Sequence, residues 1–275
     1  MIDAAPGAEE SATGAEESAM VLGRPAVFWR RRRPGAPLPI VLLHGAGGSH
    51  RSFDELVAAL DHEDVIVPAL PGRAGTECPP PSTAAEAAAF VRALLAAIGV
   101  ARFALVGHSY GGGVAIELAL ADAVAPRPSV AALLLVATGA RLRVHPAILE
   151  RARAAAAGEA PALDLRAVFR PGTDPELVAR FEARMAPVPA ASTLADWLAT
   201  HAFDRLGALA PLRMPLVALA GDHDALTPPR YAQYFVDHVA GARAVTVPGG
   251  GHMLPVEQPE AVARALRDLC ASVRV

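Results

Sequence analysis

Short segments rich in apolar residues recur along the chain from residue 21 onward, and polar or glycine-rich stretches separate them. Most of these segments are continuously apolar, which is typical of strands buried on both faces of a parallel sheet. We predict strands over residues 21–29, 40–43, 64–67, 103–106, 131–136, 216–220 and 244–247.

Helical patterns lie between the predicted strands. The clearest begins at Thr83, which precedes Glu86 by three residues as in a capping box, and ends at Gly99. Further helices are predicted over residues 114–120, 231–239 and 261–269. This alternation of strands and helices predicts right-handed βαβ units and a doubly wound sheet, in which ligands bind outside the carboxyl ends of the strands.

The alternation stops between residues 139 and 214, where the pattern is helical and no strand is indicated. Two helix faces stand out, and we interpret them as parts of a helical cap inserted between two core strands. Because such a cap lies over the carboxyl ends of the strands, its apolar side chains are candidates for a substrate pocket. The candidates are Phe181, Met185, Trp197 and Leu198.

Composition and charge narrow the class of protein. The 275 residues carry a formal net charge of −3, so the chain lacks the overall basic field typical of nucleic-acid binding. No apolar run is long enough to cross a bilayer, and residues 1–20 lack the features of a signal peptide. We therefore expect a cytoplasmic monomer or homodimer. Its domains would be a disordered acidic tail over 1–20, a core over 21–138 and 215–275, and a cap over 139–214.

Neither a metal nor a cofactor is indicated. Cys78 and Cys270 are far apart and have no metal-spaced partners. The adjacent residues Asp222, His223 and Asp224 could not easily converge on one ion. There is also no P-loop or zinc-protease pattern.

The strongest chemical motif is Gly107-His108-Ser109-Tyr110-Gly111, which follows one predicted strand and precedes a helix. A serine on such a sharp strand-to-helix turn presents its hydroxyl clear of the sheet. The turn also places the next backbone N–H, that of Tyr110, at a helix N-terminus, where an oxyanion is favoured. We predict Ser109 as a nucleophile.

A serine hydroxyl is a weak nucleophile at neutral pH and needs a base. His252 follows three glycines directly after the predicted strand over 244–247, and we predict that it is this base. Asp222 and Asp224 both follow the strand over 216–220; one would orient the imidazole and the other would form a turn.

A second glycine-rich turn, His44-Gly45-Ala46-Gly47-Gly48, follows the strand over 40–43. Such a turn can supply a second backbone donor for an oxyanion. We expect the N–H of Ala46 to serve, with that of Gly47 as the alternative.

These motifs together resemble the α/β-hydrolase superfamily, in its branch of small, lidded, cofactor-free hydrolases. The resemblance extends from about residue 21 to the C-terminus and rests on Leu42-Leu43-His44-Gly45, the Ser109 pentapeptide, Gly221-Asp222-His223-Asp224 and Gly251-His252. It implies an α/β-hydrolase fold with an inserted helical cap, and it implies Asp224 as the acid. One position departs from the family, since Ala69 stands where members often have an aspartate.

The leading functional hypothesis is hydrolysis of a small, largely apolar carboxylic ester or lactone through an acyl-enzyme. A carbon–carbon bond hydrolase, a lyase or a perhydrolase could use the same triad. The rival from a different class is a non-catalytic ligand receptor on the hydrolase fold.

Overall fold

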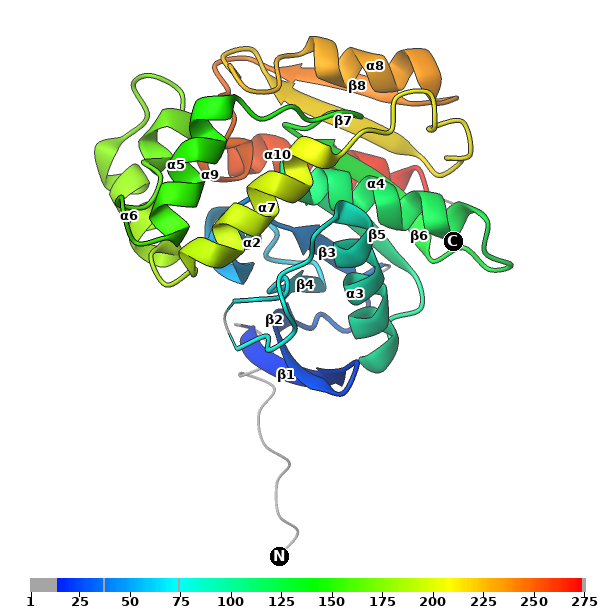
Figure 1. The fold of residues 1–275 in the computed structure, drawn as a ribbon. Coiled ribbons are helices and arrows are strands. Elements are labelled where there is room, and N and C mark those ends of the chain that lie inside the picture. The colour runs from blue at the N-terminus through cyan, green and yellow to red at the C-terminus, as the bar shows by residue number, and fades with distance from the viewer. Residues whose placement is uncertain (1–13, 37, 74, 274–275) are drawn as a thin grey trace, which may run out of the picture.

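An eight-stranded sheet runs through the middle of the computed structural model, which describes residues 14–36, 38–73 and 75–273 (Figure 1). The strand order is β1-β2-β4-β3-β5-β6-β7-β8. The first two strands are antiparallel to their neighbours, and all later pairs are parallel. The prediction of a doubly wound, mostly parallel sheet is confirmed. The strands are β1 (Ala15–Val21), β2 (Arg24–Arg31), β3 (Ile40–Leu43), β4 (Val65–Pro68), β5 (Phe103–His108), β6 (Val130–Val136), β7 (Leu216–Gly221) and β8 (Arg243–Val247).

Helices cover both faces of the sheet. One face packs against α3 (Ala84–Ala97), α4 (Tyr110–Ala123) and α8 (Arg230–His238). The other packs against α2 (Asp54–Ala59), α9 (Leu254–Glu257) and α10 (Pro259–Ala271). Within the described ranges, no helix combines the length and apolar character needed to cross a bilayer.

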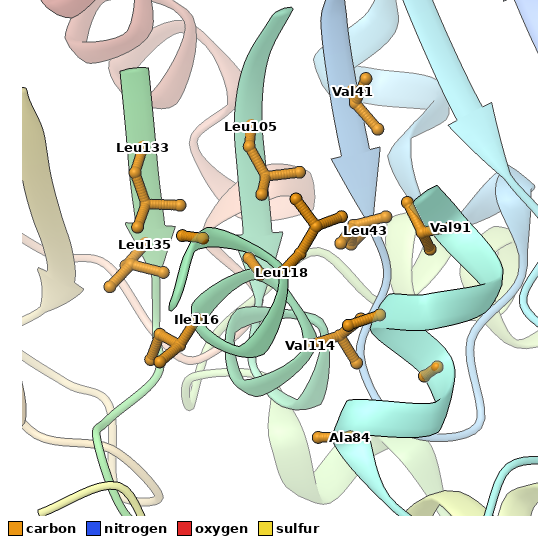
Figure 2. Close-up of a cluster of buried hydrophobic side chains, with 14 of the residues drawn as sticks. Val41, Leu43, Ala84, Val91, Leu105, Val114, Ile116, Leu118, Leu133 and Leu135 are labelled. Carbon is orange, nitrogen blue, oxygen red and sulfur yellow. The ribbon is translucent and has the colours of Figure 1, made fainter. Parts of the chain in front are cut away.

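The central strands are apolar on both sides because each side faces a helical layer. In β5, Leu105 joins the cluster under α3 and α4, whereas Val106 joins the cluster on the opposite face. Figure 2 shows the first cluster, in which side chains of β3, β5 and β6 meet those of α3 and α4. This double burial explains why continuous apolar runs, rather than alternating ones, mark the core strands.

The cap lies between β6 and β7 in the chain. It consists of α5 (Pro146–Ala156), the short 3₁₀ helix η2 (Leu165–Val168), α6 (Pro175–Met185) and α7 (Ala190–Ala202). In Figure 1, α5 and α6 lie at one side of the molecule, and α7 runs from them toward α4. The helical insertion is thus confirmed as part of the fold.

The N-terminal region differs from its prediction. The single strand expected over residues 21–29 is a hairpin of β1 and β2, whose turn residues Leu22 and Gly23 have positive φ angles of 51° and 77°. The expectation of disorder over residues 1–20 is therefore wrong for residues 15–20, which belong to β1; residues 1–13 lie outside the described residues. In β1, Glu17, Ala19 and Val21 alternate with more exposed residues, the two-residue period of an edge strand.

Candidate active site

Ser109 stands at the point where β5 ends and α4 begins. Its backbone has φ 53° and ψ −121°, a conformation that non-glycine residues rarely adopt. The neighbouring glycines make this turn possible: a Cβ at Gly107 would overlap the Gly111 backbone, and one at Gly111 would overlap the Leu43 carbonyl. The serine side chain is only partly buried, so its hydroxyl remains accessible.

Three side chains from three separate loops meet at this turn. The Nε2 atom of His252 lies 3.0 Å from the Oγ of Ser109, and its Nδ1 lies 2.9 Å from Oδ2 of Asp224. Ser109 follows β5, Asp224 follows β7 and His252 follows β8, so the parallel order of the sheet brings their loops to one edge. Both distances are those of hydrogen bonds.

Asp224 and Asp222 have different surroundings. Asp224 is buried, and its carboxylate accepts hydrogen bonds from the backbone N–H groups of Leu226 and Thr227 and from the Thr227 hydroxyl. Burial alone would raise the pKa of Asp224, but hydrogen bonding from His252, the charge of His252 and the Thr227 contacts together lower it. Asp222 is exposed and pairs with the adjacent His223 instead.

Two further residues hold the loop that carries His252, and the sequence pattern did not single them out for this role. His108 donates from Nε2 to the His252 carbonyl oxygen at 2.9 Å; burial, followed by the nearby charge of His252, lowers its pKa to about 3, so the ring is neutral. Glu257 accepts from the N–H of Gly251 at 2.9 Å and from that of Arg170 in the cap at 2.7 Å. The His108–His252 and Glu257–Arg170 contacts join residues that are 144 and 87 positions apart, which local motifs do not reveal, whereas Glu257 lies six positions from Gly251.

The two glycine-rich turns face the same space. Tyr110 is the first residue of α4, so its N–H has no acceptor within the helix. Ala46 lines the cavity that contains Ser109. The alternative donor, the N–H of Gly47, instead hydrogen-bonds to the Asp196 carboxylate at 2.9 Å.

Two neighbouring cavities lie between these turns and the cap. The smaller, about 40 Å³, is lined by Ser109, His252 and cap residues of η2, α6 and α7; the larger, about 220 Å³, is lined mainly by alanine and other apolar side chains. Ala46, Gly47, Leu165 and Trp197 line both, so the cavities share a wall.

The predicted pocket residues have different positions. Phe181 lines the smaller cavity, Met185 the larger one and Trp197 both. Leu198 lines neither cavity and is 39% exposed, because it lies on the outer side of α7. The expectation that Leu198 forms part of this pocket is wrong.

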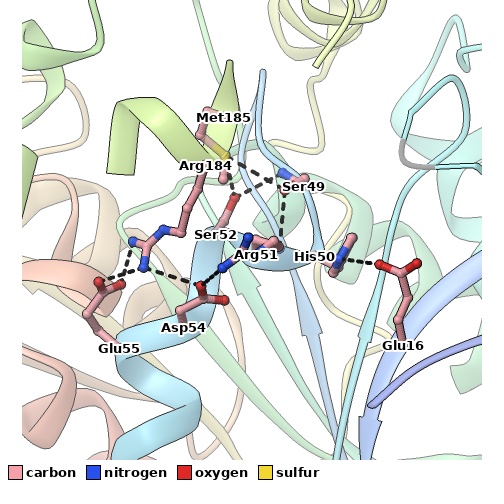
Figure 3. A network of polar contacts seen from close by, with 9 residues as sticks. All are labelled: Glu16, Ser49, His50, Arg51, Ser52, Asp54, Glu55, Arg184 and Met185. Atoms are coloured by element: carbon pink, nitrogen blue, oxygen red, sulfur yellow. Dashed lines mark hydrogen bonds and ion pairs between the residues drawn. The ribbon is translucent and has the colours of Figure 1, made fainter. Parts of the chain in front are cut away.

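Polar contacts attach α6 to the core beside the cavities (Figure 3). Arg184 forms a two-pronged ion pair with Glu55, with both N–O distances at 2.8 Å, and also reaches Asp54 at 3.3 Å. The sulfur of Met185 lies 3.3 Å from the Ser52 hydroxyl. The cap is therefore anchored at its α6 side to the helical segment that follows the Ala46 turn.

The chain belongs to the α/β hydrolase family, whose sequence profile matches residues 40–265. The family match identifies it as an enzyme of the α/β-hydrolase type. The chain is 28% identical over 260 residues to a pimeloyl-[acyl-carrier protein] methyl ester esterase of Neisseria meningitidis, with 89% of this chain and 98% of that protein aligned.

Two other likenesses extend the comparison. The polyketide synthase ThaQ of Burkholderia thailandensis is 32% identical to this chain over 249 residues. The alignment covers 85% of this chain but 12% of that long protein. The enol-lactonase of Burkholderia xenovorans has the same fold, with a TM-score of 0.82, 22% identity, and coverage of 93% of this chain and 100% of that one.

Proposed function

We propose that this protein hydrolyses a neutral carboxylic ester or lactone through an acyl-enzyme formed on Ser109. The observation that carries the proposal is the continuous hydrogen-bonded series Ser109–His252–Asp224, with distances of 3.0 and 2.9 Å, at the wall of a cavity. These are the contacts expected of a nucleophile, a base and the group that orients the base.

The first half of the reaction forms the acyl-enzyme. The Oγ of Ser109 attacks the carbonyl carbon while Nε2 of His252 takes the hydroxyl proton, and the Asp224 carboxylate stabilises the resulting imidazolium. The backbone N–H groups of Ala46 and Tyr110 donate to the carbonyl oxygen as it becomes an oxyanion. The tetrahedral intermediate then collapses, the bond to the alcohol oxygen breaks, and the alcohol leaves with the proton from His252.

The second half releases the acid. His252 takes a proton from water, the water oxygen attacks the acyl carbon, and Ser109 leaves with the proton that His252 returns. The neutral His108 supports both halves because it holds the His252 backbone without adding a positive charge beside the imidazolium.

The size and lining of the cavities support a small or medium acyl group. The larger cavity, about 220 Å³, is below the roughly 300–1,000 Å³ typical of sites for drug-sized ligands. Among the described residues that line it, Glu182 alone is charged, and Arg166 lies 3.6 Å from that carboxylate. We therefore propose a neutral, largely apolar substrate; the expectation of a cytoplasmic location rests on the sequence alone.

The other reactions considered for this triad differ in the bond that breaks. A carbon–carbon bond hydrolase, a lyase or a perhydrolase would use the same three side chains, and the methyl ester esterase among the relatives favours ester cleavage over them. A non-catalytic receptor would not need Nε2 of His252 within hydrogen-bonding distance of a serine, so the triad geometry argues against it.

The test combines labelling with a substrate screen. Fluorophosphonate treatment should label Ser109, as identified by peptide mass spectrometry, and a panel of esters, lactones and thioesters of graded acyl length should show turnover of short to medium neutral acyl groups. Failure to label Ser109 together with absence of turnover would contradict the proposal. If Ser109 is labelled but only thioesters, or substrates cleaved at a carbon–carbon bond, are turned over, Ser109 would still be the nucleophile and the proposed substrate class would be wrong.

A further inference from the structure

A fully buried ion pair joins the cap to the core. A guanidinium nitrogen of Arg73, in the loop after β4, lies 2.9 Å from Oδ1 of Asp196 on α7, and both side chains are 0% exposed. A buried ion pair often contributes less to stability than apolar side chains of the same volume, because both charges lose their hydration. Stability alone is therefore a weak reason for this pair.

The second carboxylate oxygen of Asp196 makes a different contact. Oδ2 accepts the backbone N–H of Gly47 at 2.9 Å. Gly47 has φ +68° and is followed by another glycine, so the segment carrying the Ala46 N–H has little conformational preference of its own. The hydrogen bond to the Asp196 carboxylate restrains this backbone, which the glycines alone would leave flexible.

Arg73 also reaches the start of the same turn. One of its nitrogens lies 3.4 Å from Nε2 of His44, which also accepts the N–H of Leu70 at 3.3 Å, while Nδ1 of His44 donates to the Gly45 carbonyl at 3.0 Å. Burial, followed by the charge of Arg73, holds the pKa of His44 well below its usual value, so the ring is neutral and fits this pattern. The pair thus contacts the turn on both sides of Ala46.

The helix that carries Asp196 also forms the cavity wall. Trp197 lines both cavities, and Thr193, one turn earlier, lines the larger cavity and lies against Gly47. Asp196 therefore links the helix that lines both cavities to the turn that carries the Ala46 N–H.

We propose that Asp196 is a positioning residue of the oxyanion turn: by holding the Gly47 N–H, it directs the Ala46 N–H toward the carbonyl oxygen of the substrate on Ser109. Arg73 keeps the carboxylate in place. This inference rests on the proposed function, since it assigns Asp196 to the same reaction. A misplacement of about 1 Å by a change remote from the chemistry can cost about 10²-fold in rate, so the effect is measurable.

The experiment compares two double variants that both lack the buried charges. Arg73→Met with Asp196→Leu removes the acceptor for the Gly47 N–H, whereas Arg73→Met with Asp196→Asn keeps one. The apolar pair is expected to fold with a Tm near that of the wild type, because replacing a buried ion pair with apolar groups is often neutral or stabilising. Each protein is assayed with a chromogenic butyrate ester and with a trifluoromethyl ketone, which forms an oxyanion on the serine.

The Leu double variant should lose about 10²-fold in kcat with little change in KM, and its affinity for the trifluoromethyl ketone should fall by a similar factor. The Asn double variant should lose far less of both. Equal rates in the two double variants, or a wild-type kcat in the folded Leu variant, would overturn the proposal, because a merely structural pair would affect Tm and not oxyanion binding.

The single variants provide a second route if the Leu double variant does not fold. Asp196→Asn and Asp196→Ala both remove the carboxylate that faces Arg73, but only the first keeps an oxygen that can accept from Gly47. At a temperature where both are folded, Asp196→Asn should be faster by about tenfold or more, and equal rates would refute the role. Failure of the proposed function is separate: the wild type itself would then show neither ester turnover nor fluorophosphonate labelling of Ser109.

Discussion

Two walls of the Ser109 cavity are held in place differently. The first wall, formed by the turns that carry Ser109 and Ala46, is held by close backbone packing. The second wall, formed by the cap helices, is held by side-chain contacts. At the first wall, α4 lies so close to β3 that a Cβ at Gly111 would overlap the Leu43 carbonyl. At the second, α6 and α7 attach through the Arg184–Glu55 and Arg73–Asp196 ion pairs. Few substitutions are tolerated where two backbones touch, whereas side-chain contacts can be altered by substituting one residue at a time. We infer that the first wall determines which reaction occurs, and that the cavity-lining side chains of the second wall determine which substrate is chosen. Asp196 belongs to the second wall by its place on α7, but it acts on the reaction because it reaches the Ala46 turn.

The largest expected effect is at the first wall. Ser109→Ala should lower kcat for every ester by about 10⁶-fold while the Tm stays near that of the wild type, because the hydroxyl supplies the covalent step. Steady-state kinetics on several acyl lengths and a thermal melt check both parts. Retention of wild-type turnover by the folded variant would contradict the division between the walls.

The next effect separates the two aspartates. Asp224→Asn should lower kcat by about 10⁴-fold, because an amide favours the wrong tautomer of His252. Asp222→Asn is the matched control, since Asp222 is exposed and pairs with His223. If the control variant is the slower enzyme, Asp224 is not the triad acid.

A substitution of a side chain of the second wall that lines the cavities, unlike one of Asp196, should change substrate preference rather than the chemical step. Trp197→Ala should alter kcat/KM unequally for short and longer acyl esters, because a methylene in an apolar pocket is worth about 1–3 kcal/mol and Trp197 lines both cavities. Leu198→Ala serves as the control on the same helix, since Leu198 lines neither cavity. A uniform change across the ester series would place Trp197 among the packing residues.

The first wall also carries a pH-dependent part of the stability. The folded state lowers the pKa of Asp224, so its ionised form contributes stability above the unfolded pKa of about 3.9, and this contribution is lost as the pH falls toward the folded value. We expect about 2 kcal/mol from this group near neutral pH. Urea unfolding of the wild type and Asp224→Asn at pH 7 and near pH 3 should show the difference narrowing in acid; a constant difference would argue against it.

The smallest effect concerns a region outside both walls. A chain that begins at residue 21 lacks most of β1 and the Glu16–His50 contact at 3.1 Å, so it should melt a few degrees lower, about 2–4 °C for each kcal/mol lost. Its KM values and acyl preference should be unchanged below the melting range. An unchanged Tm would show that β1 adds no measurable stability.

The sequence predicted the features that leave a local signal, either a run of apolar residues or a short motif. The core strands β3 to β7 were identified because burial on both faces leaves continuous apolar runs. Ser109 and His252 were found because each follows a strand within a recognisable glycine-containing motif. The motif left Asp222 and Asp224 as alternatives, and the resemblance to the family implied Asp224, which the structure brings together with the other two. Their catalytic roles remain predictions that the substitutions above test.

The features missed by the sequence depend on long-range contacts. β1 has a polar, alternating pattern because it lies at the edge of the sheet, and that pattern resembles a solvated tail. Leu198 was misplaced because the docking angle of α7, and not the periodicity of the helix, decides which apolar side chains face the cavities. Arg73 and Asp196 are 123 residues apart, so no local motif joins them.

The contact between α4 and β3 has a consequence for how this enzyme unfolds. Because Gly111 lies directly against Leu43, the serine turn and the strand leading to the Ala46 turn cannot separate without breaking the centre of the core. In terms of local unfolding, the amides around Tyr110 would exchange with solvent only through global opening. Loss of turnover at denaturant concentrations below the unfolding transition would then reflect detachment of the cap or of the His252 loop, and not separation of the serine turn from β3.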